Sequence, residues 1–304
     1  MSILKVERLT KDYGHGRGVF DISFEVAKGE VFGFLGPNGA GKTTAIRHIM
    51  GFSKPQEGTT WVNGANSWTQ SRQIKMELGY LSGEIALPDE LTGVQFIKMM
   101  ADLRKISNMT KTEYLIDKFE LEPNGSLKYM SLDMKRKLAI VTAFMHDPAV
   151  LVLDEPTSGL DPLMQELFIE FVKEEKALGK TILLSSHILS EVDSTCDRIA
   201  IIKDGKIVST IITNDLKHAS SKTYKIEFNS DDQYRKFTAG NFVLSSKNDA
   251  KRQVKVLVDD KDINAFIASV SEYDMKFFSE IKFTLQDYFM HFYQNNDNGK
   301  GDQK

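Results

Sequence analysis

The 304-residue chain is poor in cysteine, since Cys196 is its only one. A single thiol excludes an internal disulfide framework and any metal site built from several cysteines, and it suits a reducing compartment. No run approaches the roughly 18 consecutive apolar residues that cross a bilayer. Residues 1–8 lack the apolar stretch of a secretory signal. We therefore expect a cytoplasmic protein in which Cys196 is a small core residue.

A strong excess of charge of either sign is also missing. The 39 Lys and Arg nearly balance the 42 Asp and Glu, which leaves a formal net charge of −3. Nucleic-acid-binding domains present a clustered basic surface, so we expect no nucleic-acid partner. The 41% hydrophobic and 27% charged residues are ordinary for a globular chain and suffice for a sizeable core.

One glycine-rich stretch matches the phosphate-binding loop pattern and has the flanks that this pattern requires. An apolar run at 31–35 predicts a buried strand before it, and the spacing of Ile46, Ile49 and Met50 predicts a helix after it. The glycines let backbone N–H groups surround a phosphate, and the helix N-terminus adds partial positive charge. We expect these residues to bind a nucleotide: Gly36, Pro37, Asn38, Gly39, Ala40, Gly41, Lys42, Thr43 and Thr44. Lys42 supplies a full positive charge there, and the Thr43 hydroxyl can ligate magnesium.

Two further apolar strands end in residues suited to hydrolysis. Residues 149–155 end in Asp154 and Glu155, and residues 181–187 end in His187. A helical segment separates the strands, which predicts a parallel sheet whose ligands gather at the carboxyl ends of the strands. One carboxylate can hold a magnesium-bound water, the next can deprotonate the attacking water, and the histidine can donate to a γ-phosphate. Alone, each residue is more often structural; the phosphate loop favours the catalytic interpretation.

The wider pattern predicts an α/β fold with a P-loop nucleotide-binding core. Alternation in residues 3–30 predicts an antiparallel β subdomain, and helical periodicity predicts an insert at about 88–135. We expect one domain at 1–217 and a small α+β domain at 218–294. The polar residues 295–304 predict a disordered tail. In the second domain we expect strands at 223–228, 242–246, 254–259 and 276–279, and helices at 231–238, 262–272 and 284–294.

Together these motifs resemble the ATP-binding subunit of an ABC transporter, over residues 1 to about 215. In the family's order, the chain has the Walker A loop at 36–43, the Walker B strand at 150–154, Glu155 next, the D-loop at 158–161 and the switch histidine at His187. The resemblance implies ATP and Mg²⁺ as cofactors, with Glu155 and His187 as catalytic residues and Thr43 and Asp154 at the metal. It also implies that Tyr13 stacks on adenine.

The same resemblance implies that two such domains sandwich two ATP molecules, each also contacted by Ser131 in the signature loop of the partner. We then expect two kinds of partner, namely transmembrane permease subunits and a second ATP-binding subunit, identical or different. The chain would lie on the inner face of the cell membrane. Residues 129–135 and the small C-terminal domain look like the bacterial exporters of drugs, lantibiotics or amphipathic peptides.

Two positions depart from the family pattern. Asp133 occupies a signature-loop position that is normally glycine, so its carboxylate would face the partner's γ-phosphate and slow turnover. An alternative is that Asp133 caps the following helix. Residues 81–84 offer no glutamine at the Q-loop, which leaves Glu84 as the possible substitute near the metal.

Two other functions stay open beside the exporter motor. The Asp133 departure is compatible with a low-turnover regulatory subunit paired with a more active one. A soluble ABC-type ATPase switch acting on ribosomes or DNA is the other alternative. It is disfavoured because such proteins resemble tandem cassettes or carry a long coiled coil, and the chain has neither.

Overall fold

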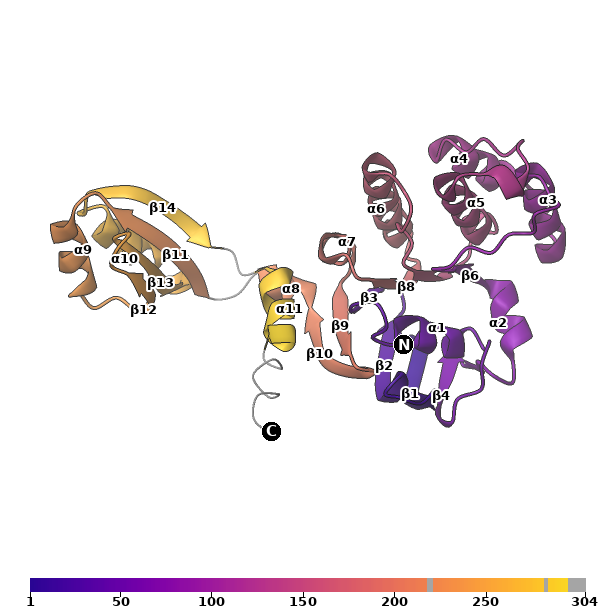
Figure 1. The fold of residues 1–304 in the computed structure, drawn as a ribbon, viewed down its shortest axis with the longest axis horizontal. Coiled ribbons are helices and arrows are strands. Elements are labelled where there is room, and N and C mark those ends of the chain that lie inside the picture. The colour runs from indigo at the N-terminus through magenta and orange to yellow at the C-terminus, as the bar shows by residue number, and fades with distance from the viewer. Residues whose placement is uncertain (218–220, 282–283, 295–304) are drawn as a thin grey trace. The chain divides into compact units, whose positions relative to one another are not determined.

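The computed structural model describes residues 1–217, 221–281 and 284–294, which form two compact units (Figure 1). The first unit ends at Thr213 and the second begins at Asn214. The predicted boundary after residue 217 instead falls at the end of the short helix α8 (Thr213–Lys217). The tail predicted at 295–304 lies outside the described residues.

A six-stranded sheet in the order β10-β9-β3-β8-β7-β6 forms the centre of the first unit. The strands are β3 (Val31–Leu35), β6 (Leu78–Leu81), β7 (Val150–Asp154), β8 (Thr181–Ser186), β9 (Arg198–Lys203) and β10 (Lys206–Ile212). All neighbours pair in parallel except β9 and β10, which form an antiparallel hairpin. Every residue of β3, β7 and β8 is buried, as expected of parallel strands covered on both faces. Their carboxyl ends therefore meet at one edge.

The predicted antiparallel β subdomain is present as a second sheet in the order β2-β1-β4-β5. It consists of β1 (Ser2–Asp12), β2 (Gly18–Ala27), β4 (Glu57–Val62) and β5 (Ala65–Asn66). The alternation of buried and exposed residues along β2 matches the sequence pattern. Phe24 of β2 stacks on Phe32 of β3 with 5.2 Å between ring centroids, so the two sheets share one hydrophobic core.

Helices pack around these two sheets in the first unit. They are α1 (Lys42–Ile49), α2 (Ser71–Glu77), α3 (Gly93–Arg104), α4 (Thr110–Lys118), α5 (Leu132–Phe144), α6 (Pro162–Ala177) and α7 (Leu189–Thr195). The helices α3, α4 and α5 lie together as the helical insert (Figure 1), although α5 continues beyond the predicted limit of residue 135. A capping box of Thr92 and Gln95 begins α3. No helix in the described ranges is both long and apolar enough to cross a membrane.

The second unit contains the strands and helices that the sequence predicts. They are β11 (Ser221–Phe228), α9 (Asp231–Thr238), β12 (Leu244–Asn248), β13 (Gln253–Asp259), α10 (Ile263–Val270), β14 (Met275–Ile281) and α11 (Leu285–Gln294). The antiparallel sheet has the order β12-β13-β11-β14, which is the split β-α-β arrangement. The aromatic side chains of Phe228, Phe237 and Phe266 lie in its own core.

Candidate nucleotide and hydrolysis site

The predicted phosphate loop connects β3 to α1, and its backbone favours glycine at key positions. Gly39 and Gly41 have φ angles of 81° and 110°, in the left-handed region that side chains disfavour. A Cβ atom at Gly36 would lie 2.5 Å from the carbonyl oxygen of Ile202, which is closer than non-bonded atoms approach. Gly41 is also the N-cap of α1. The loop is therefore held close to neighbouring backbone, with the helix N-terminus at its end.

Lys42 is the first residue of α1, and its ammonium group is buried inside the loop. Its side chain is 5% exposed, and Nζ donates to the carbonyl oxygens of Gly36 at 2.6 Å and Pro37 at 3.2 Å. Nζ also lies 2.9 Å from Oε1 of Glu155, at the end of β7. Lys42 thus connects the phosphate loop with the strand-end glutamate.

Asp154 ends β7 as a fully buried carboxyl. The Ser185 hydroxyl donates to its Oδ1, while Oδ2 has no hydrogen-bond partner among the described residues. Burial raises the pKa of Asp154, and the nearby hydroxyls of Ser185 and Thr43 oppose that rise. A Cβ atom at Gly83 would lie 3.3 Å from Oδ2. An unpaired, buried carboxylate oxygen beside the Thr43 hydroxyl suits a hard cation that keeps most of its ligands from water and phosphate.

Glu155 follows the strand in a backbone conformation that turns its side chain toward β8. Its φ angle is 47°, which is uncommon for a residue with a side chain. Its backbone N–H donates to the Ser185 carbonyl at 3.0 Å. Its Oε2 lies 2.6 Å from Nδ1 of His187, which is half exposed beyond the end of β8. Lys42, Glu155 and His187 therefore form one continuous polar chain, which we call the Lys42–Glu155–His187 chain.

Three other predicted residues lie on separate elements. Tyr13 is 52% exposed in the turn between β1 and β2, where an aromatic face is open to solvent. Ser131 precedes α5, and Glu84 is exposed in the loop after β6. Within the described ranges, no hydrogen bond or ion pair joins any of these three to the Lys42–Glu155–His187 chain. The structure therefore brings together the residues of the strand ends and the phosphate loop, but not these.

The helix-cap interpretation of Asp133 is wrong. Ser131 is the N-cap of α5, and its hydroxyl accepts from the N–H of Met134 at 3.2 Å. Asp133 lies in the first turn, where a negative charge still complements the helix dipole. Its Oδ2 is 3.4 Å from Nζ of Lys137, one turn along the helix. The carboxylate is therefore partly neutralised by its own helix.

Arg136 of α5 joins loops that sequence reasoning did not connect. The side chain is 2% exposed, and its guanidinium donates to the carbonyls of Ser82 at 2.7 Å, Gly83 at 2.8 Å and Ser158 at 2.8 Å. Burial lowers the pKa of Arg136, and the charges of Asp154 and Glu155 act against that change. The sequence offers no signal for this role, because a basic residue on an amphipathic helix is usually exposed.

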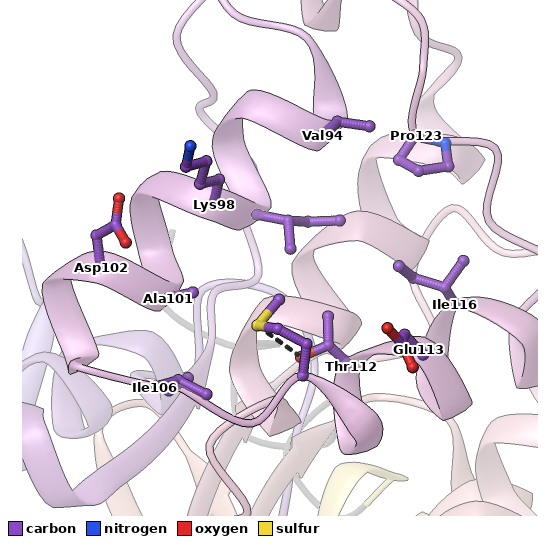
Figure 2. Close-up of a pocket in the computed structure, with 11 residues that line it drawn as sticks. Val94, Lys98, Ala101, Asp102, Ile106, Thr112, Glu113, Ile116 and Pro123 are labelled. Atoms are coloured by element: carbon purple, nitrogen blue, oxygen red, sulfur yellow. Dashed lines mark hydrogen bonds between the residues drawn. The ribbon is translucent and has the colours of Figure 1, made fainter.

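The helical insert contains a cavity apart from these residues. It has a volume of about 370 Å³ and is lined by side chains of α3, α4 and the segments that follow them. Figure 2 shows Val94 and Ala101 of α3 facing Thr112 and Ile116 of α4 across it. None of the predicted site residues lines this cavity, so it is no part of the nucleotide site.

Comparisons with known proteins agree with this geometry. The family model described as "ABC transporter" matches residues 19–158, and a second, described as "AAA domain, putative AbiEii toxin, Type IV TA system", matches residues 125–193. The chain is 34% identical to the bacitracin transport ATP-binding protein BcrA of Bacillus licheniformis, over 76% of each chain. It is 30% identical to the uncharacterized ABC transporter ATP-binding protein YdbJ of Bacillus subtilis (strain 168), over 95% of this chain and 94% of that protein.

A solved structure titled "Structure of ATP binding subunit of ABC transporter" superposes with a TM-score of 0.65. It is 31% identical and the match covers 71% of this chain and 92% of that one. The predicted family and the α/β P-loop fold are therefore confirmed. The chain belongs to the ATP-binding subunits of ABC transporters and is an ATPase.

Proposed function

We propose that this protein hydrolyses ATP at the side chains of the Lys42–Glu155–His187 chain. It then drives a bacterial exporter through separate membrane subunits. The observation that carries the proposal is the placement of a buried ammonium, a carboxylate and a histidine at the strand edge beside a phosphate loop. A buried cation interacts strongly with phosphate oxygens because little solvent screens it.

Each residue of the Lys42–Glu155–His187 chain has a distinct task in this proposal. The loop N–H groups and Lys42 hold the phosphates, and Glu155 takes the proton of the attacking water. Because His187 uses Nδ1 to contact Glu155, its Nε2 is left for the γ-phosphate. The exposed Tyr13 supplies the stacking face for adenine.

Thr43 and Asp154 would hold Mg²⁺, and we propose Glu84 as a third candidate ligand of the ion. The unpaired Oδ2 of Asp154 supports the first two assignments. When bound, Mg²⁺ would neutralise phosphate charge as ATP is cleaved. No group of three or more His, Cys, Asp or Glu side chains in the described part of the chain forms a metal site by itself, which agrees with an ion shared with ATP.

The proposed assembly is a nucleotide-sandwich dimer on the inner face of the cell membrane. Ser131 would contact the nucleotide of the partner subunit, and transmembrane permease subunits would carry the cargo. The bacitracin transport relative supports an exporter of drugs, lantibiotics or amphipathic peptides. The alternative of a low-turnover regulatory subunit is favoured by Asp133, whose side chain is 31% exposed.

Chemical cross-linking in membranes of the source bacterium tests the proposed assembly. The expected product joins this chain to a protein with several membrane spans. Recovery of the chain on ribosomes or DNA, with no membrane protein cross-linked, would favour the soluble switch instead.

A further inference from the structure

Helix α7 contains a buried carboxyl that the proposed chemistry does not use. Glu191 is 1% exposed, and an acid so deeply buried usually has a specific partner. The Ser186 hydroxyl donates to its Oε2, whereas Oε1 has no hydrogen-bond partner within the described residues. Burial raises the pKa of Glu191 to about 7, and the nearby hydroxyls of Ser186 and Thr157 oppose the rise.

Ser186 is the last residue of β8 and directly precedes His187. Its hydroxyl accepts from the N–H of Ile188 at 2.9 Å while it donates to Glu191. Its carbonyl accepts from the N–H of Gly36 at 3.3 Å. Because a hydroxyl has one proton, donation to Glu191 fixes its orientation and directs its lone pairs toward Ile188. The residues on both sides of His187 are thus held by one oriented hydroxyl.

The same carboxyl lies near the turn after the other catalytic residue. The buried Thr157, whose side chain is close to Glu191, is in the segment that follows Glu155. His187 reaches Glu155 through its Nδ1 at 2.6 Å. Glu191 therefore lies between the segments that carry both ends of this contact. A well-packed apolar residue would cost less free energy at a purely structural position.

We propose that Glu191 is a positioning residue for ATP hydrolysis, whose carboxyl acts through the Ser186 hydroxyl to hold the 186–188 turn so that His187 contacts Glu155. The inference rests on the proposed roles of Glu155 and His187. A residue that acts only by orienting His187 affects the chemical step and leaves ATP affinity unchanged.

Two substitutions in the full chain separate positioning from packing. Glu191→Met keeps the approximate length but removes the acceptor, and it should lower kcat about tenfold with KM within about twofold, as for one lost orienting hydrogen bond. Glu191→Gln keeps an acceptor oxygen for Ser186 and should restore most of the lost rate. Thr195→Val is the matched control, because it removes a 2.7 Å bond to the Glu191 carbonyl on the same helix without touching the carboxyl. It should lower thermal stability and leave kcat unchanged.

A double-mutant cycle with His187→Ala gives the decisive comparison. If Glu191 acts through His187, adding Glu191→Met to His187→Ala should cause no further loss of kcat. The inference is overturned if Glu191→Met has the wild-type rate, or if it lowers the rate by the same factor in both backgrounds. A wild-type rate in His187→Ala would instead overturn the proposed role of His187, and the inference with it.

Discussion

At the scale of single residues, the strand-end site contains side chains that are paired with an opposite charge and buried carboxyls that are not. Lys42 and Glu155 neutralise one another, while Asp154 and Glu191 are buried with one carboxyl oxygen each lacking a hydrogen bond. Such groups destabilise the nucleotide-free fold, so their retention is better explained by ligand binding and positioning than by stability.

The raised pKa of Glu191 predicts a pH-dependent stability. Its folded pKa of about 7 exceeds the ordinary 4.5, so the folded state holds the proton more tightly. This favourable contribution is complete below the ordinary pKa and is lost as the pH rises through the folded pKa. Of the charged groups near Glu191, Glu155 is paired with Lys42 and His187.

Glu191→Gln does not titrate, so its melting temperature relative to wild type should rise between about pH 5 and pH 8. Thermal denaturation without nucleotide measures this difference. Glu166→Gln, at an exposed carboxylate of α6, serves as the control and should show a nearly constant difference. A constant difference for Glu191→Gln would mean that Glu191 is ionised throughout this range.

At the scale of elements, Arg136 connects α5 to the loops after β6 and β7. We expect Arg136→Met to lower the free energy of unfolding of the first unit by about 3 kcal/mol, because three partly buried carbonyls lose the donor that a buried guanidinium supplies. Arg136→Lys should recover only part of this, since an ammonium lacks the planar fork of donors. Urea denaturation measures both.

The control for Arg136 is Lys135→Met, a neighbouring and less buried position of α5, which should change stability by less than about 0.5 kcal/mol. Equal effects of Lys135→Met and Arg136→Met would show that the three carbonyl contacts contribute little. ATPase activity should also fall in Arg136→Met, since Ser82 and Ser158 lie in the loops that flank the strand-end carboxylates.

The strand edge could be predicted because each of its parts is local in sequence. Apolar runs predict β7 and β8, and the residues that end them follow directly. Helix α2 was not predicted, because only Ile74 is buried along it and no hydrophobic period results. The cap interpretation of Asp133 failed because Ser131, two residues earlier, takes the N-cap position.

The contacts of Arg136 and Glu191 were beyond sequence reasoning for another reason. Ser82 is 54 residues from Arg136 in the chain, and only the folded sheet brings them together. Glu191 lies near its partner Ser186 in sequence, but a glutamate in a helix is normally solvated, so its burial has no local signal.

At the scale of the whole molecule, the proposed sandwich dimer gives Asp133 a part in how two subunits work together. In a sandwich dimer its carboxylate would face the γ-phosphate of the partner's ATP. Two unit charges about 4 Å apart repel by roughly 4 kcal/mol at an effective dielectric near 20. Lys137, 3.4 Å from Asp133, reduces this repulsion.

Asp133→Gly should therefore raise ATP-driven dimerisation and steady-state hydrolysis of the homodimer by up to about tenfold. The gain should be smaller in a mixed pair, where only one site uses this signature loop. Asp133→Asn separates charge from shape and should give most of the gain. Unchanged dimerisation and turnover, with lower thermal stability, would assign Asp133 a structural role only.

The central claim is that the Lys42–Glu155–His187 chain hydrolyses ATP between two subunits, and trapping the dimer tests it most directly. Glu155→Gln preserves the side-chain shape but cannot take a proton from water. Size-exclusion chromatography with light scattering in Mg²⁺ and ATP should show a stable dimer for Glu155→Gln, and a monomer once Lys42→Ala is added. A Glu155→Gln chain that hydrolyses ATP at the wild-type rate and stays monomeric would contradict the account.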